Sequence, residues 1–409
     1  MTTSQLKPNP AYPLAGLHEE RRPFAVVAGI DINGLGVVRS LAKAAVPTIV
    51  VDTDLSKPTA QTRFGRKIRV SSLSGRAFIN DLLSLAGHLP EPPALFLTRE
   101  DSVETALSAQ PELKSRYRFT MPAPNIMEAL LDKAQFQQLA EKLHYPVPRA
   151  VRIQGPDIAD KLSGLRFPCA IKPLRKDAAY SARFKKAYRL ETVSETLELW
   201  SRMQNVAEEA LVQEWIDGGD SAVYFCLQYR PVAGDGVVSF VGRKLCQWPP
   251  LVGGTACCIP APEFHHELTA LTDAFFKDVG FVGLGSMEYK QDTRDKKFYM
   301  VEPTVGRTDY QQEIATLNGV NIPHAVYASE TGERGGGEGV ARTGRPCAWQ
   351  DTDAFKNALA AGATNMLPDV LPHANVMDAC WRLDDPGPFL HTKFIAVQRR
   401  LGLSPRQNV

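Results

Sequence analysis

The sequence has no run of about 18 consecutive apolar residues, which is the shortest that a membrane-spanning helix needs. Its first 22 residues, MTTSQLKPNPAYPLAGLHEERR, also contain no apolar segment of signal-peptide length. We therefore expect no membrane span, and a cytoplasmic location is the default prediction.

The chain also lacks an excess of charge of one sign. It has 47 Lys and Arg residues against 45 Asp and Glu residues, which gives a formal net charge of +2. Proteins that hold nucleic acids by electrostatic attraction are usually far more basic. No nucleic-acid partner is therefore expected.

Cysteine is scarce and shows no pattern. The chain has seven cysteines: Cys169, Cys226, Cys246, Cys257, Cys258, Cys347 and Cys380. Their number is odd, and neither a C-x-x-C pair nor a Cys/His ligand spacing occurs. Reduced thiols are expected, and a structural zinc site is not.

The length and the N-terminal third predict a multidomain α/β protein. At 409 residues the chain is long for one core, so two or three domains are expected. The stretch FAVVAGIDINGLGVVRSLAKAAVPTIVVDTD predicts strand, glycine turn, helix and strand. Gly34 and Gly36 form part of a dinucleotide fingerprint, but Arg39 stands where a third glycine would be. A turn that needs small residues is the favoured interpretation, and a dinucleotide site is the alternative.

The stretch GSMEYKQDTRDKKFYMVEP predicts a hairpin with an unusual charge pair. If it folds about Asp295, Glu288 lies opposite Glu302. Opposed residues of an antiparallel pair point to the same side, with Cβ atoms about 5 Å apart, and like charges there destabilise the sheet. Either the register is shifted by a residue or two, or a cation belongs between the two carboxylates.

Several motifs occur in the order of a known family. The stretches LLDKAQF, CAIKP, VQEWIDGGDSAV and GRKLCQWPPLVGGT precede the hairpin. With it they contain, in chain order, Lys133, Lys172, Glu214, Asp220, Arg243, Glu288 and Glu302. Together they resemble the ATP-grasp superfamily from about residue 24 to about residue 330. The order is most similar to carboxylate–amine ligases of the D-aspartate ligase and carbamoyl-phosphate-synthetase-like branches.

The resemblance implies an α/β fold with a Rossmann-like pre-ATP-grasp domain, followed by an ATP-grasp domain of two α+β subdomains. The Gly- and Arg-rich stretch ETGERGGGEGVARTGRP predicts a linker or mobile loop after them. The expected segments are a flexible N-terminus (1–22), the pre-ATP-grasp domain (23–122), the ATP-grasp domain (123–330, hinge near 211–220), the linker (331–346) and a small C-terminal appendage (347–409).

The resemblance also implies a nucleotide site. Lys133 and Lys172 would contact phosphates, as compact cations do. Asp220 would bond the ribose hydroxyls. The loop after Lys172 is basic and lacks glycine, and Lys185 is its expected phosphate contact. An extended hinge offers N–H and C=O groups to adenine, and the residues expected to do so are Gln213, Glu214 and Ile216.

The resemblance implies that the two hairpin carboxylates hold Mg²⁺, or Mn²⁺, beside the nucleotide. Such an ion would offset the repulsion between them. Glu288 and Glu302 would be ligands of one or two ions, with Thr304 where the family usually has Asn. Arg243 and Arg307 would stabilise charge on the transferred phosphoryl group and on the acyl phosphate.

The resemblance implies an ATP-dependent carboxylate–amine (or thiol) ligase that forms an acyl phosphate and releases ADP and phosphate. Its partners would be small-molecule carboxylates and amines, and a homodimer is left open. One alternative is an ATP-grasp protein that binds nucleotide without ligating anything. A less favoured one is a dinucleotide-dependent oxidoreductase that uses the N-terminal unit.

Overall fold

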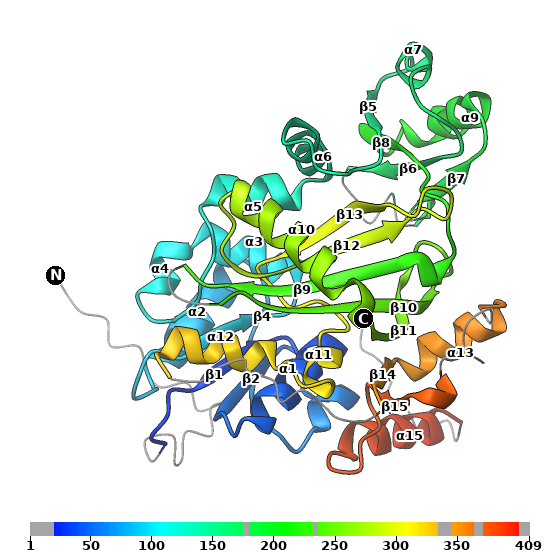
Figure 1. The fold of residues 1–409 in the computed structure, drawn as a ribbon. Helices are drawn as coiled ribbons and strands as arrows, with labels where there is room; N and C mark the ends of the chain where they lie inside the picture. Colours follow the sequence, from blue (N-terminus) through cyan, green and yellow to red (C-terminus); the bar gives the residue numbers. More distant parts are fainter. Residues whose placement is uncertain are drawn as a thin grey trace.

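The computed structural model describes residues 20–174, 180, 182–185, 187–232, 236–333, 345–363 and 371–400. Three sheets organise this part of the chain, as Figure 1 shows, and each has its own layer of helices. None of the helices described is long and apolar enough to cross a membrane. The α/β fold class predicted from the sequence is confirmed.

The N-terminal domain is built on a four-stranded parallel sheet with the order β3-β2-β1-β4. Its strands are β1 (Ala25–Ala28), β2 (Thr48–Asp52), β3 (Arg66–Arg69) and β4 (Ala94–Leu97). Its helices are α1 (Ile32–Lys43), η2 (Pro58–Gln61), α2 (Gly75–Ala86), α3 (Glu100–Ser108) and α4 (Gln110–Lys114). Every residue of β1, β2 and β4 is buried, as expected for a parallel sheet covered on both faces.

Gly34 and Gly36, at the start of α1, allow close packing of the chain. A Cβ atom at Gly34 would lie 2.0 Å from the carbonyl oxygen of Gly29. One at Gly36 would lie 3.0 Å from Cβ of Glu313, which belongs to another domain. Both positions therefore favour glycine for close approach of the chain, although both lie inside α1 and not in the turn that precedes it.

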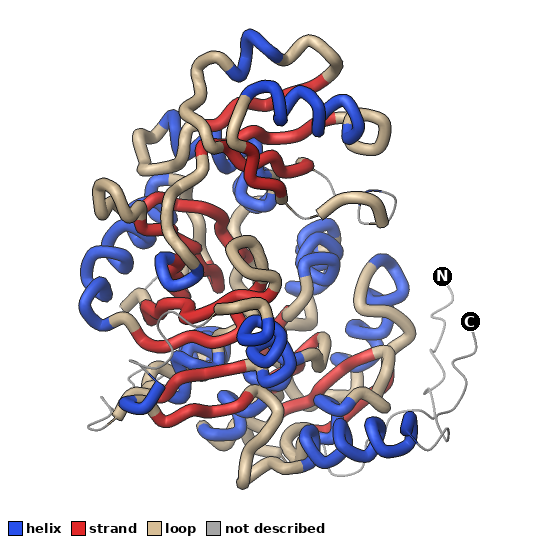
Figure 2. The backbone as a smooth tube through the Cα atoms, turned by 90° about the vertical axis from the view of Figure 1, so that its right-hand side faces the viewer, coloured by secondary structure: helices blue, strands red, loops and turns tan. Residues whose placement is uncertain are grey.

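The second sheet forms a small subdomain, at the top right of Figure 1 and the top of Figure 2. It is antiparallel with the order β5-β8-β6-β7. Its elements are β5 (Ala150–Gln154), α7 (Ala159–Leu162), β6 (Cys169–Pro173), β7 (Tyr188–Leu190), α9 (Val193–Met203) and β8 (Glu209–Glu214). Trp200 lies at the centre of its separate core, 1% exposed. The helices α5 (Pro124–Leu131) and α6 (Lys133–Lys142) lead into it from the N-terminal domain.

The third sheet is the largest, with the order β13-β12-β9-β10-β11-β14-β15. Its central elements are η3 (Asp220–Ala222), β9 (Val223–Arg230), β10 (Val238–Trp248), β11 (Gly254–Pro260), η4 (Pro262–Phe264), β12 (Gly283–Gln291) and β13 (Phe298–Val305). Helix α10 (His265–Asp278) covers one face. Helices α11 (Glu313–Leu317) and α12 (Ile322–Thr331) pack between the other face and α1 of the N-terminal domain.

The C-terminal region, for which the sequence predicts a small appendage, extends the large sheet. Its elements are β14 (Cys347–Gln350), α13 (Thr352–Ala360), η5 (Leu371–His373), β15 (Asn375–Asp378) and α15 (Gly387–Arg400). Strand β14 pairs with β11, so two more strands extend the large sheet. Of the predicted linker, residues 334–344 lie outside the described part of the chain.

A buried ion pair attaches this region to the N-terminal domain. Asp385 is 0% exposed and accepts hydrogen bonds from Arg39 Nε (2.9 Å) and Thr62 Oγ1 (2.7 Å). Arg39, which interrupts the glycine pattern of the first turn, also donates to the carbonyl oxygens of Ala379 and Cys380. Its guanidinium therefore has a structural partner in the last part of the chain.

Candidate functional site

The predicted hairpin is present with the predicted pairing. Glu288 on β12 lies directly opposite Glu302 on β13. The register shifts just beyond this pair, because Tyr289 is opposite Met300 and Val301 is the extra residue. The two carboxylates therefore lie on one face of the sheet, at a bulge in the ladder.

Each carboxylate has its own lysine. Lys244 Nζ lies 2.5 Å from Glu288 Oε2, and Lys133 Nζ lies 3.5 Å from Glu302 Oε1. The Lys244 side chain is only 4% exposed, whereas that of Glu302 is 43% exposed. Each of the opposed glutamates is thus paired with an ammonium group, one from β10 and one from the start of α6.

Thr304 lies on the same face, opposite Ser286. Ser286 donates a hydrogen bond to Asp309 Oδ2 (3.0 Å), so a further carboxylate approaches this face from the loop after β13. Asp309 does not stand out in the sequence, because it lies in a loop with no flanking motif.

The donor set fits a metal ion that arrives with a phosphate ligand. Within the described ranges, no group of three or more His, Cys, Asp or Glu side chains could hold a metal ion. Glu288, Glu302 and Thr304 offer two carboxylates and a hydroxyl on one face. Mg²⁺ is typically held by one or two carboxylates together with phosphate oxygens and water. These residues could hold Mg²⁺ or Mn²⁺ in that way.

Arg243 and Lys244 face opposite sides of the large sheet. Arg243 is opposite Tyr224, which is in turn opposite Tyr289, whereas Glu288 is opposite Phe225. Since side chains alternate along a strand, Arg243 points to the side away from Glu288. Its Nε donates to the carbonyl oxygen of Ser221 (2.6 Å), and its guanidinium lies 5.3 Å from the Tyr224 ring centroid.

The arginine expected at the transferred phosphoryl group is therefore on the face away from the hairpin glutamates. Lys244, the next residue of the motif GRKL, lies on the face of Glu288 and contacts it. The sequence shows two adjacent cations, Arg243 and Lys244, in one predicted strand. Because side chains alternate between the two faces of a strand, only one of the two can lie on the face of Glu288.

A chain of hydrogen bonds links the hinge to the hairpin. Asp220 Oδ1 accepts from Gln247 Nε2 (3.1 Å), and Lys244 Nζ donates to Gln247 Oε1 (3.3 Å) as well as to Glu288. Asp220 also accepts from the backbone N–H groups of Gln247 (2.8 Å) and Leu251 (2.7 Å). Both oxygens of Asp220 are thus bonded within the protein, and a ribose would have to share them.

On the small sheet, the second predicted lysine is bonded to the hinge. Lys172 Nζ donates to Gln213 Oε1 (3.0 Å), and Gln213 Nε2 donates to Gln137 Oε1 on α6 (3.0 Å). Gln213 and Ile216 are both 5% exposed. The structure thus brings Lys172 and Gln213 together on one face of the small sheet.

Glu214 is bonded on the far side of the same strand. Its N–H donates to the carbonyl oxygen of Arg149 (2.8 Å) and its Oε1 accepts from the N–H of Arg166 (2.9 Å). Its side chain is 10% exposed. These contacts hold the hinge strand in the sheet, so Glu214 keeps few groups for a nucleotide.

Arg307 and Lys185 are less closely connected to the other residues. Arg307 Nη1 donates to the carbonyl oxygen of Thr308 (3.1 Å), and Thr308 Oγ1 donates to Asn33 at the start of α1 (2.6 Å). The Arg307 loop is thereby fixed to the N-terminal domain. Lys185 is exposed, and its Nζ lies 6.0 Å from the Tyr188 ring centroid. Residues 175–179 of its loop lie outside the described chain.

One further cation on the hairpin face was not predicted. Lys290 is 8% exposed, and its Nζ lies 4.5 Å from the centroid of the Trp215 ring in the hinge. Burial lowers the pKa of Lys290 to about 8, against the attraction of Asp220 and Asp217. No sequence signal marked it, because a lysine in a strand is usually exposed.

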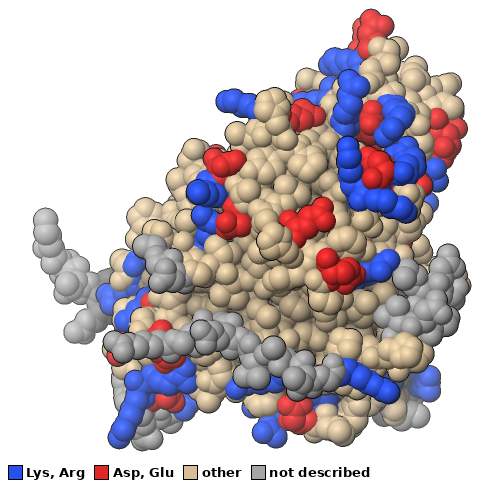
Figure 3. Space-filling view, viewed as in Figure 1, with Lys and Arg blue, Asp and Glu red and all other residues tan. Residues whose placement is uncertain are grey.

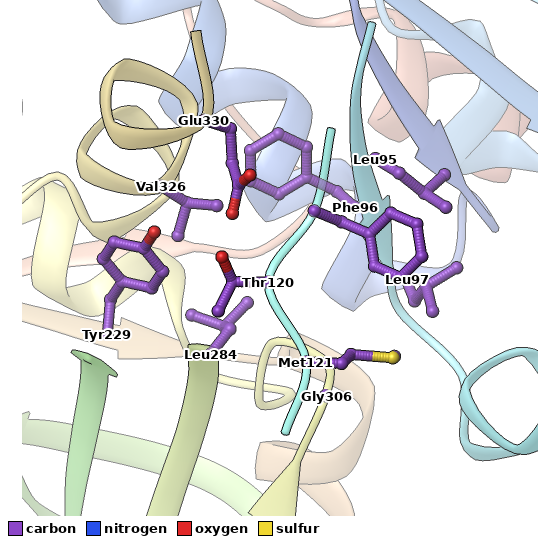
Figure 4. A pocket seen from close by; sticks show the side chains of 11 residues that line it. Leu95, Phe96, Leu97, Thr120, Met121, Tyr229, Leu284, Gly306, Val326 and Glu330 are labelled. Carbon is purple, nitrogen blue, oxygen red and sulfur yellow. The ribbon is translucent and has the colours of Figure 1, made fainter. Parts of the chain in front are cut away.

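The charge distribution favours the hairpin face over a separate apolar cavity as a nucleotide site. Lys and Arg side chains gather over the small subdomain at the upper right of Figure 3. A separate cavity lies between β4, β9, β12 and α12, and Figure 4 shows its lining of mostly apolar side chains around Glu330. None of its lining residues is Lys or Arg, and burial raises the pKa of the Glu330 carboxyl. That cavity does not suit an anionic nucleotide.

Comparison with known proteins shows the fold. No protein-family model matches the sequence, and no curated protein matches it. Among solved structures, an N5-carboxyaminoimidazole ribonucleotide synthetase from Thermus thermophilus has a TM-score of 0.59 at 15% identity, covering 78% of this chain and 81% of that one. An N5-carboxyaminoimidazole synthetase from Staphylococcus aureus, complexed with ADP, has a TM-score of 0.58 at 12% identity, covering 77% and 79%.

A third solved structure extends the likeness to carboxylases. The biotin carboxylase domain of the Hydrogenobacter thermophilus 2-oxoglutarate carboxylase, in complex with MgADP, ADP and bicarbonate, has a TM-score of 0.59 at 12% identity. The match covers 76% of this chain and 70% of that one. The chain has the ATP-grasp fold that its motifs predict; the likeness does not select a branch of the superfamily.

Proposed function

We propose that this chain of ATP-grasp fold is an ATP-dependent carboxylate–amine (or thiol) ligase. The observation that carries the proposal is the opposed pair Glu288 and Glu302, each with a lysine, on one face of the large sheet. Two opposed carboxylates on one face repel each other, and they can hold a divalent cation in addition to the two ammonium groups. That cation would offset the charge on the phosphates of a nucleotide, which is a use that fits the fold.

The nucleotide would lie between the small sheet and the hairpin. Lys172 and Lys133 are the proposed phosphate contacts, because ammonium groups make strong charge-assisted bonds to phosphate. Gln213 and Ile216 would hold the base at the hinge. Asp220 would contact the ribose only by sharing oxygens that Gln247 and Leu251 already use.

A divalent ion would be held by Glu288 and Glu302, with Thr304 as a neutral oxygen. When bound, it would offset phosphate charge. The protein's own share of the work is positional and electrostatic, as is usual in phosphoryl transfer. Lys244 and Lys133 hold the two carboxylates in place, and Arg307 supplies a fixed charge from the loop after β13.

The proposed reaction has two steps. A substrate carboxylate oxygen attacks the γ-phosphorus of ATP, so that the bond to the bridging oxygen breaks and ADP leaves with an acyl phosphate formed. An amine nitrogen, or a thiol, then attacks the acyl carbon, loses its proton, and displaces inorganic phosphate. In this proposal Lys244 would stabilise the negative charge that develops on oxygen in both steps.

The test is a screen of carboxylates and amines for ADP release with Mg-ATP. We expect one acid and amine pair to raise ADP release well above the rate with ATP alone, in equal amounts with a condensation product. Glu302→Gln is the matched negative control. Saturable ATP binding without ADP release for any pair would instead favour a nucleotide-binding protein that ligates nothing, and no ATP binding would exclude both.

A further inference from the structure

Lys290 has no part in the reaction proposed above, although it is a buried cation beside the site. It is 8% exposed, and the face of the Trp215 ring is its close neighbour. Within the ranges that the structure describes, its Nζ takes part in no hydrogen bond and no ion pair. Burying an ammonium group without hydrogen-bond acceptors is costly. A ligand that supplies a hydrogen-bond acceptor would offset the cost of burying the Lys290 ammonium group.

The place of Lys290 along the strand indicates which part of a ligand it meets. It lies two residues beyond Glu288 on β12, on the same face and about 7 Å further along. The end of the hairpin touches the hinge, because Thr293 N donates to the carbonyl oxygen of Asp217 (3.1 Å). Lys290 therefore lies between the carboxylate pair and the hinge.

We propose that Lys290 is a nucleobase-recognition residue, whose ammonium donates a hydrogen bond to an acceptor atom of the purine base and so sets the base selectivity of the site. This inference rests on the proposed function, in which Glu288 and Glu302 meet the phosphates and the hinge meets the base. An ammonium group is a donor only. It therefore favours bases that present a ring nitrogen or carbonyl oxygen at this position and disfavours those that present an amino group.

Trp215 has a supporting role in this arrangement. The centroid of its ring lies 4.5 Å from the Lys290 ammonium and 5.6 Å from the Arg189 guanidinium on β7. The ring therefore holds the lysine side chain at the junction of the small sheet and the large one. A cation–π contact orients an ammonium group without using its N–H donors, so all three remain for a ligand.

The experiment compares nucleotide binding by the full-length wild type, Lys290→Met and Lys297→Met. Lys297 is an exposed lysine of the same hairpin, so its variant controls for loss of charge alone. Dissociation constants are measured for ATP, GTP, CTP and inorganic tripolyphosphate, together with the thermal unfolding midpoint without ligand. Lys290→Gln repeats the test with a neutral polar side chain, in case the methionine variant does not fold.

We expect Lys290→Met to bind the preferred purine nucleotide roughly 10-fold or more weakly, the usual size of one charge-assisted hydrogen bond. The preference over CTP should shrink with it, while tripolyphosphate binding and the Lys297→Met variant remain at wild-type values. The midpoint without ligand should not fall, because an uncompensated buried charge has been removed.

Four outcomes would overturn the inference. Equal weakening for nucleotides and tripolyphosphate would make Lys290 a phosphate contact. An unchanged base preference with a lowered midpoint would make it a structural partner of Trp215. Wild type that binds no nucleotide at all would overturn the proposed function as well, whereas wild-type binding that Lys290→Met leaves unchanged would overturn the base-recognition role alone.

Discussion

At the scale of single residues, the charge on the hairpin face is balanced side chain by side chain. Lys244 is nearly buried against Glu288, while Lys133 is a longer and more exposed contact to Glu302. Substitution of one residue in the Lys244–Glu288 pair should therefore differ in effect from substitution in the Lys133–Glu302 pair. The buried pair matters to folding and to charge, and the exposed pair matters mainly to charge.

Glu302→Gln is expected to remove ATP turnover and leave the fold intact. The substitution deletes one negative charge and no packing, and exposed ion pairs contribute little to stability. Loss of one aimed electrostatic contact typically costs about 10²–10³ in kcat. ADP release and the thermal midpoint would be measured together. Parental turnover in the variant would refute the assignment of Glu302 to the site.

Lys244→Met and Arg243→Met form a pair of variants that tests the strand alternation. We expect Lys244→Met to lose ADP release by about 10²-fold or more, since Lys244 faces Glu288. Arg243→Met should keep most of the activity, because its side chain lies over Tyr224 on the opposite face. The reverse ranking, with both proteins folded by circular dichroism, would show that the cation at the reacting group is Arg243.

At the scale of elements, the hinge and the end of β10 are joined through one carboxylate. Asp220 accepts three hydrogen bonds, two from Gln247 and one from the N–H of Leu251. It therefore fixes the loop after β10 against η3 before any nucleotide binds. The role predicted from the sequence, a ribose contact, concerns the bound state only.

Asp220→Asn separates these two roles. An amide offers one acceptor oxygen and places an NH₂ group against an N–H donor, which leaves a donor unpaired at a cost of about 1–3 kcal/mol. We expect a lower free energy of unfolding in urea without nucleotide, together with a raised KM for ATP. A stability equal to wild type with a raised KM would mean that Asp220 acts on the ribose alone.

At the scale of the whole molecule, the last part of the chain connects the two larger units. Strands β14 and β15 extend the large sheet, and Asp385 pairs with Arg39 on α1. Arg382 Nη2 also lies 2.9 Å from Glu313 Oε2 on α11. Both ion pairs are buried, so they hold the N-terminal domain, the large sheet and the C-terminal region together.

Arg39→Met is expected to loosen this connection. It leaves Asp385 buried without its charge partner, and breaking a buried pair typically costs about 3–5 kcal/mol. We expect a lower thermal midpoint and faster proteolysis of the C-terminal region. Arg76→Met, which removes an exposed pair with Glu112, is the matched control and should change neither quantity. Equal behaviour of the two variants would show that the buried pair is not needed for docking.

The sequence by itself determined the local elements and the order of the chemical groups. Alternating residues and turn residues between Glu288 and Glu302 were enough to predict the hairpin and its pairing, because neighbouring strands joined by a short turn have few registers. The missing third glycine also favoured a structural role for Gly34 and Gly36, and the close contacts at both positions support that role. These features depend on residues close together in the chain.

Only the tertiary structure decided which side chains share a face with the hairpin glutamates. Arg243 and Lys244 are adjacent in sequence, and their choice of face is set by pairing with β9 and β12, which no local pattern contains. The burial of Lys290 follows from Trp215, which lies 75 positions away in the sequence. The same holds for β14, which is separated in the chain from its partner β11 by α10, the whole hairpin, α11 and α12. The exposure of a side chain and the sheet face on which it lies depend on how several elements pack together. Neither can be deduced from one element alone.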